Sequence, residues 1–207
     1  MEAFCFGALF RPSRLARIFR PAGKIDLKKE VENHFNSGYP LYRHRCTIQM
    51  EESILNFYIS MTEENMEPFT VVYMRRTGGY GEENAALMRR FKDWARENGL
   101  EDAAILAVAL DDPLRTKDAK CRYDVCMRCP EDGRADLSQV RVRAFAGGKY
   151  AVFLIPHTAE AVGAAWRECF LALADGGFAL DAGRPVVERY PRALVDRRLC
   201  EICVPIL

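Results

Sequence analysis

Two segments of the chain, residues 68–129 and 140–207, carry hydrophobic patterns that predict the same order of elements. In the first segment, a β-branched and aromatic run at 69–74 predicts a strand, and apolar residues at helical spacing over 87–95 predict a helix. Continuous apolar runs at 104–110 and 121–129 predict two further strands. The first segment therefore has the order strand, helix, strand, strand.

The second segment repeats that order. Strands are predicted at 140–145 and 150–155, on either side of a turn at Gly147 and Gly148, and Thr158 is placed to cap the helix that follows. The last two strands are predicted at 185–190 and 199–206. We therefore expect an α+β fold of duplicated strand-helix-strand-strand modules. These would form a pseudo-twofold antiparallel sheet with helices on one side and a central ligand groove between the halves.

The residues before 67 have a different character. A short basic segment at 1–24 contains arginines at every third position from Arg11 to Arg20, and a helical pattern begins at Asp26. Weaker patterns indicate a strand at 42–50 and a helix at 51–61. We interpret residues 1–66 as an N-terminal extension and residues 67–207 as the binding domain.

Composition limits the classes of function. The chain has 207 residues, 49% of them hydrophobic, and a net charge of +1. Such near-neutrality argues against a surface that binds polyanions over the whole molecule. No stretch reaches the roughly 20 apolar residues of a membrane helix, and the first apolar run lacks the positive start of a signal peptide. We expect a cytoplasmic protein without membrane contact, whose eight cysteines are reduced.

The candidate chemistry is an acid among aromatic residues. Strand alternation places Glu188 and Tyr190 on one face, and Glu201 would face the same groove if the last two strands are neighbours. A buried carboxylate is costly without a counter-charge, which a bound lipophilic cation would supply. The alternative is that Glu188 is a solvent-exposed strand residue paired with Arg189 or Arg192.

Aromatic walls would add cation–π attraction to such a site. The candidate wall residues are Tyr80, Trp94, Tyr123, Tyr150, Trp166 and Tyr190. Because Trp94 and Trp166 lie on predicted helix faces, ordinary core packing is the alternative role for both.

Two C-x-x-C pairs, Cys126 with Cys129 and Cys200 with Cys203, raise the question of zinc. Both pairs lie in predicted strands, where residues three apart point to opposite faces and cannot converge on one ion. The histidines have no metal-ligand spacing and no nucleophile motif beside them. We therefore assign no metal, no cofactor and no catalytic residue.

Short motifs occur in a fixed order at residues 71–80, 110–113, 122–124, 147–153, 188–190 and 201–205. Their order resembles the GyrI-like effector-binding family, the ligand-sensing domain of many AraC-type and MerR-type bacterial regulators. The resemblance implies a pocket between two similar halves, lined by aromatics and often holding a glutamate that recognises lipophilic cations. Glu188 matches that position. The sequence departs from the family pattern at Gly79, at residues 158–159 and at Cys203.

Residues 10–20 resemble the last recognition helix of an AraC-type DNA-binding domain. Only this fragment is present, and a lone basic helix cannot fix a register on DNA, so we do not expect direct DNA binding by this chain.

We predict a small-molecule binding domain that senses or sequesters lipophilic, cationic aromatic compounds, as multidrug-binding regulators of transcription do. The resemblance leaves two alternatives open. One is a hydrolase of strained electrophilic toxins that carry a cyclopropane ring, and the other is a protein that interacts with gyrase.

Overall fold

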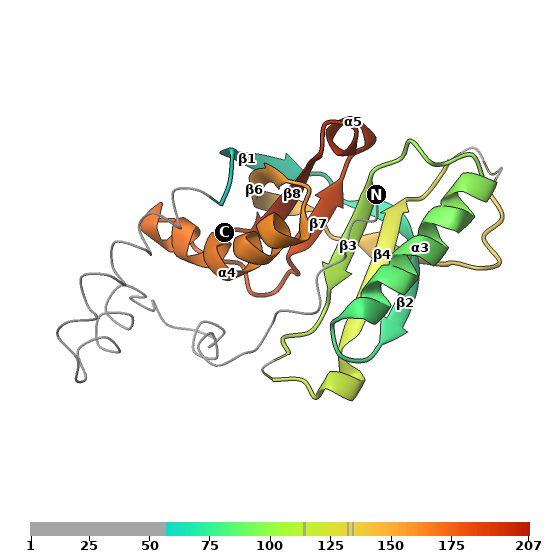
Figure 1. The fold of residues 1–207 in the computed structure, drawn as a ribbon, viewed down its shortest axis with the longest axis horizontal. Coiled ribbons are helices and arrows are strands. Elements are labelled where there is room, and N and C mark those ends of the chain that lie inside the picture. Colours follow the sequence, from blue (N-terminus) through green and yellow to red (C-terminus); the bar gives the residue numbers. More distant parts are fainter. Residues whose placement is uncertain (1–56, 114, 132, 134) are drawn as a thin grey trace.

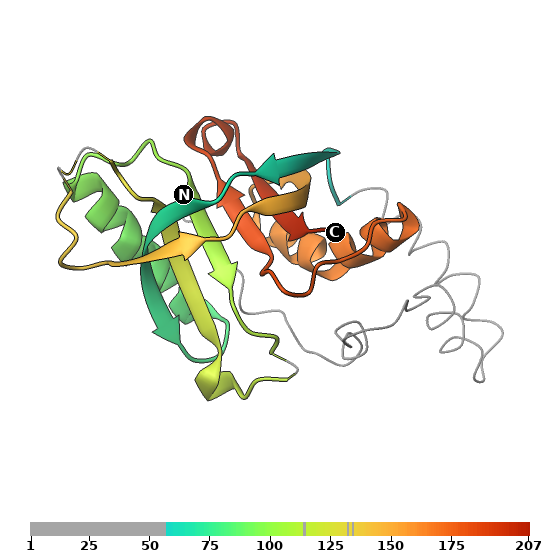
Figure 2. The ribbon, with the colours of Figure 1, turned by 180° about the vertical axis from the view of Figure 1, so that it is seen from behind.

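The computed structural model describes residues 57–113, 115–131, 133 and 135–207. These residues form a curled antiparallel sheet of eight strands, with helices packed on one of its faces (Figures 1 and 2). The α+β class predicted from the sequence is confirmed. No helix in this part of the chain is long and apolar enough to cross a bilayer.

The strands are β1 (Ser60–Met66), β2 (Phe69–Thr77), β3 (Ile105–Ala109), β4 (Arg122–Arg128), β5 (Arg141–Phe145), β6 (Gly148–Pro156), β7 (Val187–Tyr190) and β8 (Leu199–Pro205). The helices are α3 (Glu82–Glu97), α4 (Ala159–Asp175) and the short α5 (Arg192–Val195), with a 3-10 turn η1 at Asp118–Lys120.

The strands lie in the order β1-β6-β8-β7-β3-β4-β2-β5. One half of the sheet contains β2, β3 and β4 with helix α3, and the other contains β6, β7 and β8 with helix α4. The halves meet where β3 pairs with β7. The outer strands cross between the halves. Strand β1 precedes β2 in the chain but pairs with β6, and strand β5 precedes β6 but pairs with β2.

Side-chain alternation along the strands separates the core into two clusters. Val72 and Met74 of β2 pack with the apolar residues of α3 and α4, on what we call the helix face. Val71 and Tyr73 belong to a second cluster on the opposite face of the curled sheet, called the second face below. A buried strand residue can therefore be assigned to a face from its register.

Two local features follow directly from the sequence. Thr158 caps α4 as predicted, because its hydroxyl accepts a hydrogen bond of 3.1 Å from the backbone N–H of Ala161. Gly147 has a φ of 67°, and a Cβ there would collide with the backbone carbonyl of Met66. The β5–β6 turn thus lies against the end of β1, and only glycine fits this close approach.

The main differences from the sequence prediction lie at the edges of the fold. Residues 60–66 form strand β1, so the interpretation of 51–61 as a helix is wrong for its last residues. Residues 51–56, the predicted strand at 42–50 and the basic segment at 1–24 lie outside the described residues. Helix α5, between β7 and β8, was not predicted.

Candidate functional site

Glu188 is a buried acid at the junction of the two halves. It lies on β7, next to Ala107 of β3 and Ile202 of β8, and only 2% of its surface is exposed. The indole N–H of Trp166 donates to its Oε1 at 2.7 Å, and the hydroxyl of Tyr190 donates to its Oε2 at 2.6 Å. Burial raises the pKa of the Glu188 carboxyl, and these two hydrogen bonds oppose that rise.

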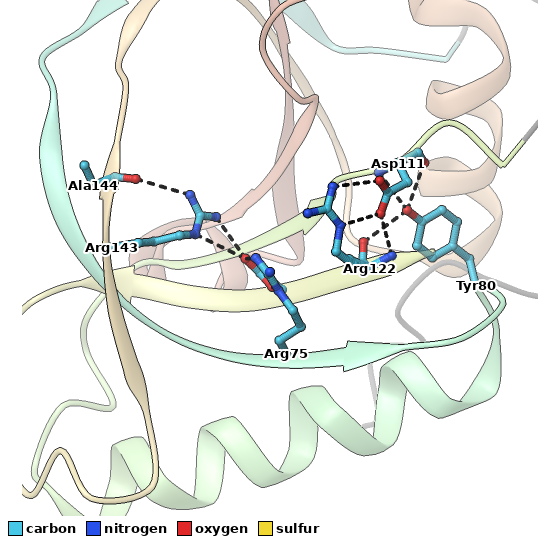
Figure 3. A network of polar contacts seen from close by, with 7 residues as sticks. Arg75, Tyr80, Asp111, Arg122, Arg143 and Ala144 are labelled. Atoms are coloured by element: carbon cyan, nitrogen blue, oxygen red, sulfur yellow. Dashed lines mark hydrogen bonds and ion pairs between the residues drawn. The ribbon is translucent and has the colours of Figure 1, made fainter. Parts of the chain in front are cut away.

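The hydrogen-bond partners of Glu188 differ from those of Asp124, a buried acid on the other side of the sheet. Asp124 is fully buried and accepts hydrogen bonds from Arg75 at 2.6 and 2.9 Å and from Arg143 at 3.2 Å (Figure 3). Within the described residues, no lysine or arginine forms an ion pair with Glu188. Asp124 thus has its counter-charges inside the fold, whereas Glu188 has two neutral donors.

The alternative interpretation of Glu188 was an exposed residue that pairs with Arg189 or Arg192, and both arginines have other partners. Arg189 points to the second face, where it pairs with Glu64 and Glu201 at 2.6 Å each. Arg192 pairs with Asp196 at 2.9 Å. The view of Glu188 as a solvent-exposed residue paired with either arginine is therefore wrong.

Glu201 does not share a groove with Glu188. The strands β7 and β8 are neighbours as supposed, but the register places Arg189 beside Glu201 and Glu188 beside Ile202. Glu201 therefore lies on the second face, with its carboxylate bound to Arg189. This corrects the expectation that both acids face the same groove.

A pocket of about 400 Å³ lies on the helix face and is lined by Tyr190, the hydrogen-bond partner of Glu188. Both halves contribute to it, since α3 and the start of β3 form one side, while His157, Tyr190 and α5 form the other. Its apolar wall is formed by Met88, Ala95, Ala103, Ile105 and Val195.

Tyr190 connects the pocket to the acid. It lines the pocket, and its hydroxyl binds Glu188, which is itself not among the lining residues. Tyr190 therefore stands between the pocket and the carboxylate.

The remaining predicted wall residues are dispersed. Trp166 contacts Glu188, but Trp94 is a core residue that donates to the carbonyl of Asp136 at 2.9 Å. Tyr123 is buried with its ring 6.2 Å from that of Tyr80. The structure thus brings together Glu188, Trp166 and Tyr190, and leaves Trp94, Tyr80 and Tyr123 elsewhere on the helix face.

Tyr80 belongs to a polar network at the ends of β3 and β4. Its hydroxyl lies 2.9 Å from the carbonyl of Asp111 and 3.1 Å from that of Arg122, whose guanidinium pairs with the Asp111 carboxylate at 2.8 Å (Figure 3). Burial raises the pKa of the Tyr80 phenol. Through these contacts Tyr80 links the end of β3 to the start of β4, which is a structural role.

Tyr150 lies on the second face, on the side of the sheet opposite Glu188. It packs against Phe145, and the guanidinium of Arg184 lies 4.8 Å from the centre of its ring. A role of Tyr150 in binding the same ligand as Glu188 stays a prediction that this placement does not support.

The cysteine pairs are divided between the faces, as strand alternation predicts. Cys126 and Cys203 are in the core of the second face, whereas Cys129 and Cys200 pack on the helix face. Burial raises the pKa of the Cys126 and Cys203 thiols to about 12. Cys126 and Cys203 are therefore protonated thiols within the packing.

The pocket contains residues that the sequence did not single out as ligand contacts. Met88 and Lys92 are four residues apart on α3, and His157 directly follows β6. Their signal in the sequence is weak, because helical spacing alone does not distinguish a pocket wall from ordinary core packing.

The sequence of the described fold matches a known family. A profile of the GyrI-like small molecule binding domain matches residues 60–207. The matched range begins at the first residue of β1 and contains every strand of the sheet.

A curated relative comes from Bacillus subtilis (strain 168). It is YosT, an SPbeta prophage-derived protein that is named as a candidate transcriptional regulator, and it is 39% identical to this chain over 150 residues. The alignment covers 72% of this chain and 99% of YosT.

Solved structures share the fold at low sequence identity. The crystal structure of the EcmrR C-terminal domain has a TM-score of 0.53 and 10% identity, over 72% of this chain and 97% of that one. The structure of SAV2435 bound to tetraphenylphosphonium has a TM-score of 0.50 and 16% identity, over 72% of this chain and 94% of that one. At such identities the similarity shows the fold alone. The profile match and the identity to YosT show more, and the chain belongs to the family of GyrI-like small-molecule binding domains.

Proposed function

We propose that this domain senses or sequesters lipophilic, cationic aromatic compounds, as the ligand-binding part of a system that regulates transcription in the cytoplasm. The observation that carries the proposal is Glu188, a buried carboxylate whose described partners are the neutral donors Trp166 and Tyr190. A relative in fold, SAV2435, has been solved with a lipophilic cation bound.

The physical argument concerns the cost of burying charge. An ionised carboxylate in the interior is destabilising by several kcal/mol unless an opposite charge or strong donors compensate it. Asp124 has two arginines for this purpose, whereas Glu188 has neutral donors. A bound organic cation would supply the missing charge, and the rings of Trp166 and Tyr190 would add cation–π attraction of about 0.5–2 kcal/mol each.

The proposed binding place is the junction of the halves. The element order of β2, α3, β3 and β4 recurs in β6, α4, β7 and β8, and we interpret this recurrence as a duplicated module with a pseudo-twofold axis near the β3–β7 pair. The pocket beside Tyr190 would then be the outer part of the central groove. The ligand would enter there and replace the hydroxyl of Tyr190 on Glu188.

Residues 1–66 are proposed to be an extension outside the binding unit proper, except where β1 completes the sheet. Direct DNA contact is not part of the proposal. Signalling to transcription would pass through a partner or another domain.

Titration of the protein with tetraphenylphosphonium, followed by calorimetry, tests the proposal. Triphenylphosphine oxide serves as the uncharged comparison compound. Glu188→Gln keeps the size of the side chain and an oxygen for Trp166, so we expect it to weaken cation binding at least tenfold and to leave the neutral compound unaffected. Glu160→Gln, at an exposed position on α4, is the matched control. Equal affinity of the Glu188→Gln variant and the parent for the cation would refute the proposal.

A further inference from the structure

The pocket beside Tyr190 contains a polar corner that Glu188 does not explain. His157 and Lys92 both line the pocket, one at the end of β6 and the other on α3. The His157 ring centre lies 5.1 Å from that of Tyr190, so this corner adjoins the tyrosine that covers the acid. Neither residue was predicted from the sequence to contact a ligand.

His157 has a buried nitrogen without a partner. Its Nε2 is shielded from solvent, and no donor or acceptor in the described part of the chain lies within hydrogen-bonding reach of it. Burial and the nearby Lys92 ammonium lower the pKa of the imidazole, which is therefore neutral at pH 7. A buried polar nitrogen without a partner is destabilising, so a ligand oxygen that bonded to it would be favoured.

Lys92 supplies an uncompensated positive charge to the same corner. The other cations that line the pocket have acidic partners, because Arg96 pairs with Asp93 at 2.8 Å and Arg192 pairs with Asp196 at 2.9 Å. No acid among the described residues forms an ion pair with Lys92.

The pocket lining also includes one acid, Glu101. Glu101 acts electrostatically on Arg192 of α5 and contributes to the raised pKa of its guanidinium. The corner therefore combines the Lys92 ammonium with a ring nitrogen of His157 that has no hydrogen-bond partner among the described residues.

We propose that this corner is a second subsite, which binds the carboxylate of the ligand between Nζ of Lys92 and Nε2 of His157. The inference rests on the proposed function and makes it more specific. The ligand is an apolar, aromatic zwitterion whose body lies on Met88, Ala95, Ile105 and Val195, whose cationic end is directed to Glu188, and whose carboxylate is held at the rim. A pocket of about 400 Å³ is of the size that holds a compact multi-ring molecule.

A matched pair of dyes tests the subsite. Rhodamine 110 carries a free carboxylate, and rhodamine 123 is its methyl ester, with the same cationic ring system. We expect the full chain to bind rhodamine 110 about tenfold more tightly than rhodamine 123, as measured by fluorescence anisotropy, because only rhodamine 110 brings a negative charge to the Lys92 ammonium.

The variants Lys92→Gln and His157→Phe should each reduce this preference, taken as the ratio of the two affinities in the same variant, to less than about threefold. His157→Phe keeps the ring contact with Tyr190, and thermal unfolding of each variant checks that the fold is intact. Arg89→Gln, at an exposed position on the same helix, is the charge control and should keep the full preference.

The outcomes separate the two proposals. Equal binding of the two dyes, tighter binding of the ester, or a preference that survives in both variants would overturn the second subsite alone. The Glu188→Gln variant could keep the preference for rhodamine 110 and bind both dyes with the affinities of the parent protein. That result would support the subsite and would show that Glu188 has no role in binding. Failure of both dyes and of tetraphenylphosphonium to bind would overturn the proposed function and the subsite with it.

Discussion

The hydroxyl of Tyr190 donates a hydrogen bond of 2.6 Å to Glu188, while the same tyrosine forms part of the pocket wall. The two residues lie on one face of β7, two positions apart. The phenol therefore covers the carboxyl group of Glu188 and is hydrogen-bonded to it. In the proposed function, a bound cation exchanges this contact for a charged one, so the occupancy of the pocket is linked to the ionisation of Glu188.

The stability of the protein should depend on pH through Glu188. Its pKa is raised in the folded state, so the stability that comes from its protonated form is complete below the unfolded value, near 4.5, and is lost as the pH rises through the folded value. Glu188→Gln remains neutral at all pH values. We expect the free energy of unfolding of this variant to increase relative to the parent by up to about 1.4 kcal/mol per pH unit in that window.

Urea unfolding of both proteins at intervals from pH 4.5 to 8 measures this difference. Because the comparison is between two proteins under the same conditions, titration of other groups largely cancels. A stability difference that does not change with pH would show that burial does not shift the pKa of the Glu188 carboxyl group.

Much of this site could be predicted from the sequence, and the missing parts have physical causes. Alternation along a strand is local, so it placed Glu188 and Tyr190 on one face. The register between β7 and β8 is not local, and it moved Glu201 to the opposite face from Glu188. The contact from Trp166 depends on how α4 packs on the sheet, which helical spacing does not determine.

The edge of the fold was missed for a different reason. Strand β1 has the polar sequence SMTEENM, without an apolar alternation that would indicate a strand. It is held by its pairing with β6 at the margin of the sheet, and polar residues are common on such edge strands. Tertiary pairing therefore decided its conformation.

Removal of Arg75 should destabilise the fold without affecting ligand binding. Its guanidinium makes two of the hydrogen bonds to the buried Asp124, and a buried charge that loses a partner costs about 3–5 kcal/mol, which the remaining Arg143 should reduce to about 2–3 kcal/mol here. Arg128→Met, which removes an exposed arginine over the ring of Phe69, should cost less than about 1 kcal/mol. Chemical unfolding of Arg75→Met and Arg128→Met compares the two positions, and equal losses would contradict the assignment.

Thr158 should contribute to stability through its cap on α4. Thr158→Ala removes the acceptor for the backbone N–H of Ala161 and should lower the free energy of unfolding by about 0.5–2 kcal/mol. Thr158→Ser retains the hydroxyl and should lose less than half of that amount. If both variants unfolded at the same denaturant concentration, the methyl group rather than the hydroxyl would be the stabilising part.

The two tryptophans of the chain should report ligand binding very differently. Trp166 donates its indole N–H to Glu188, whereas Trp94 is 1% exposed and bonded to the carbonyl of Asp136, away from the pocket lining. A cation that binds Glu188 changes the charge and hydrogen bonding next to Trp166 only. We therefore expect the intrinsic fluorescence of Trp94→Phe to respond to tetraphenylphosphonium as the parent protein does, and that of Trp166→Phe to lose most of the response. A response that persisted in Trp166→Phe and disappeared in Trp94→Phe would place the ligand next to Trp94 and Asp136 instead, and Glu188 would then have no part in binding.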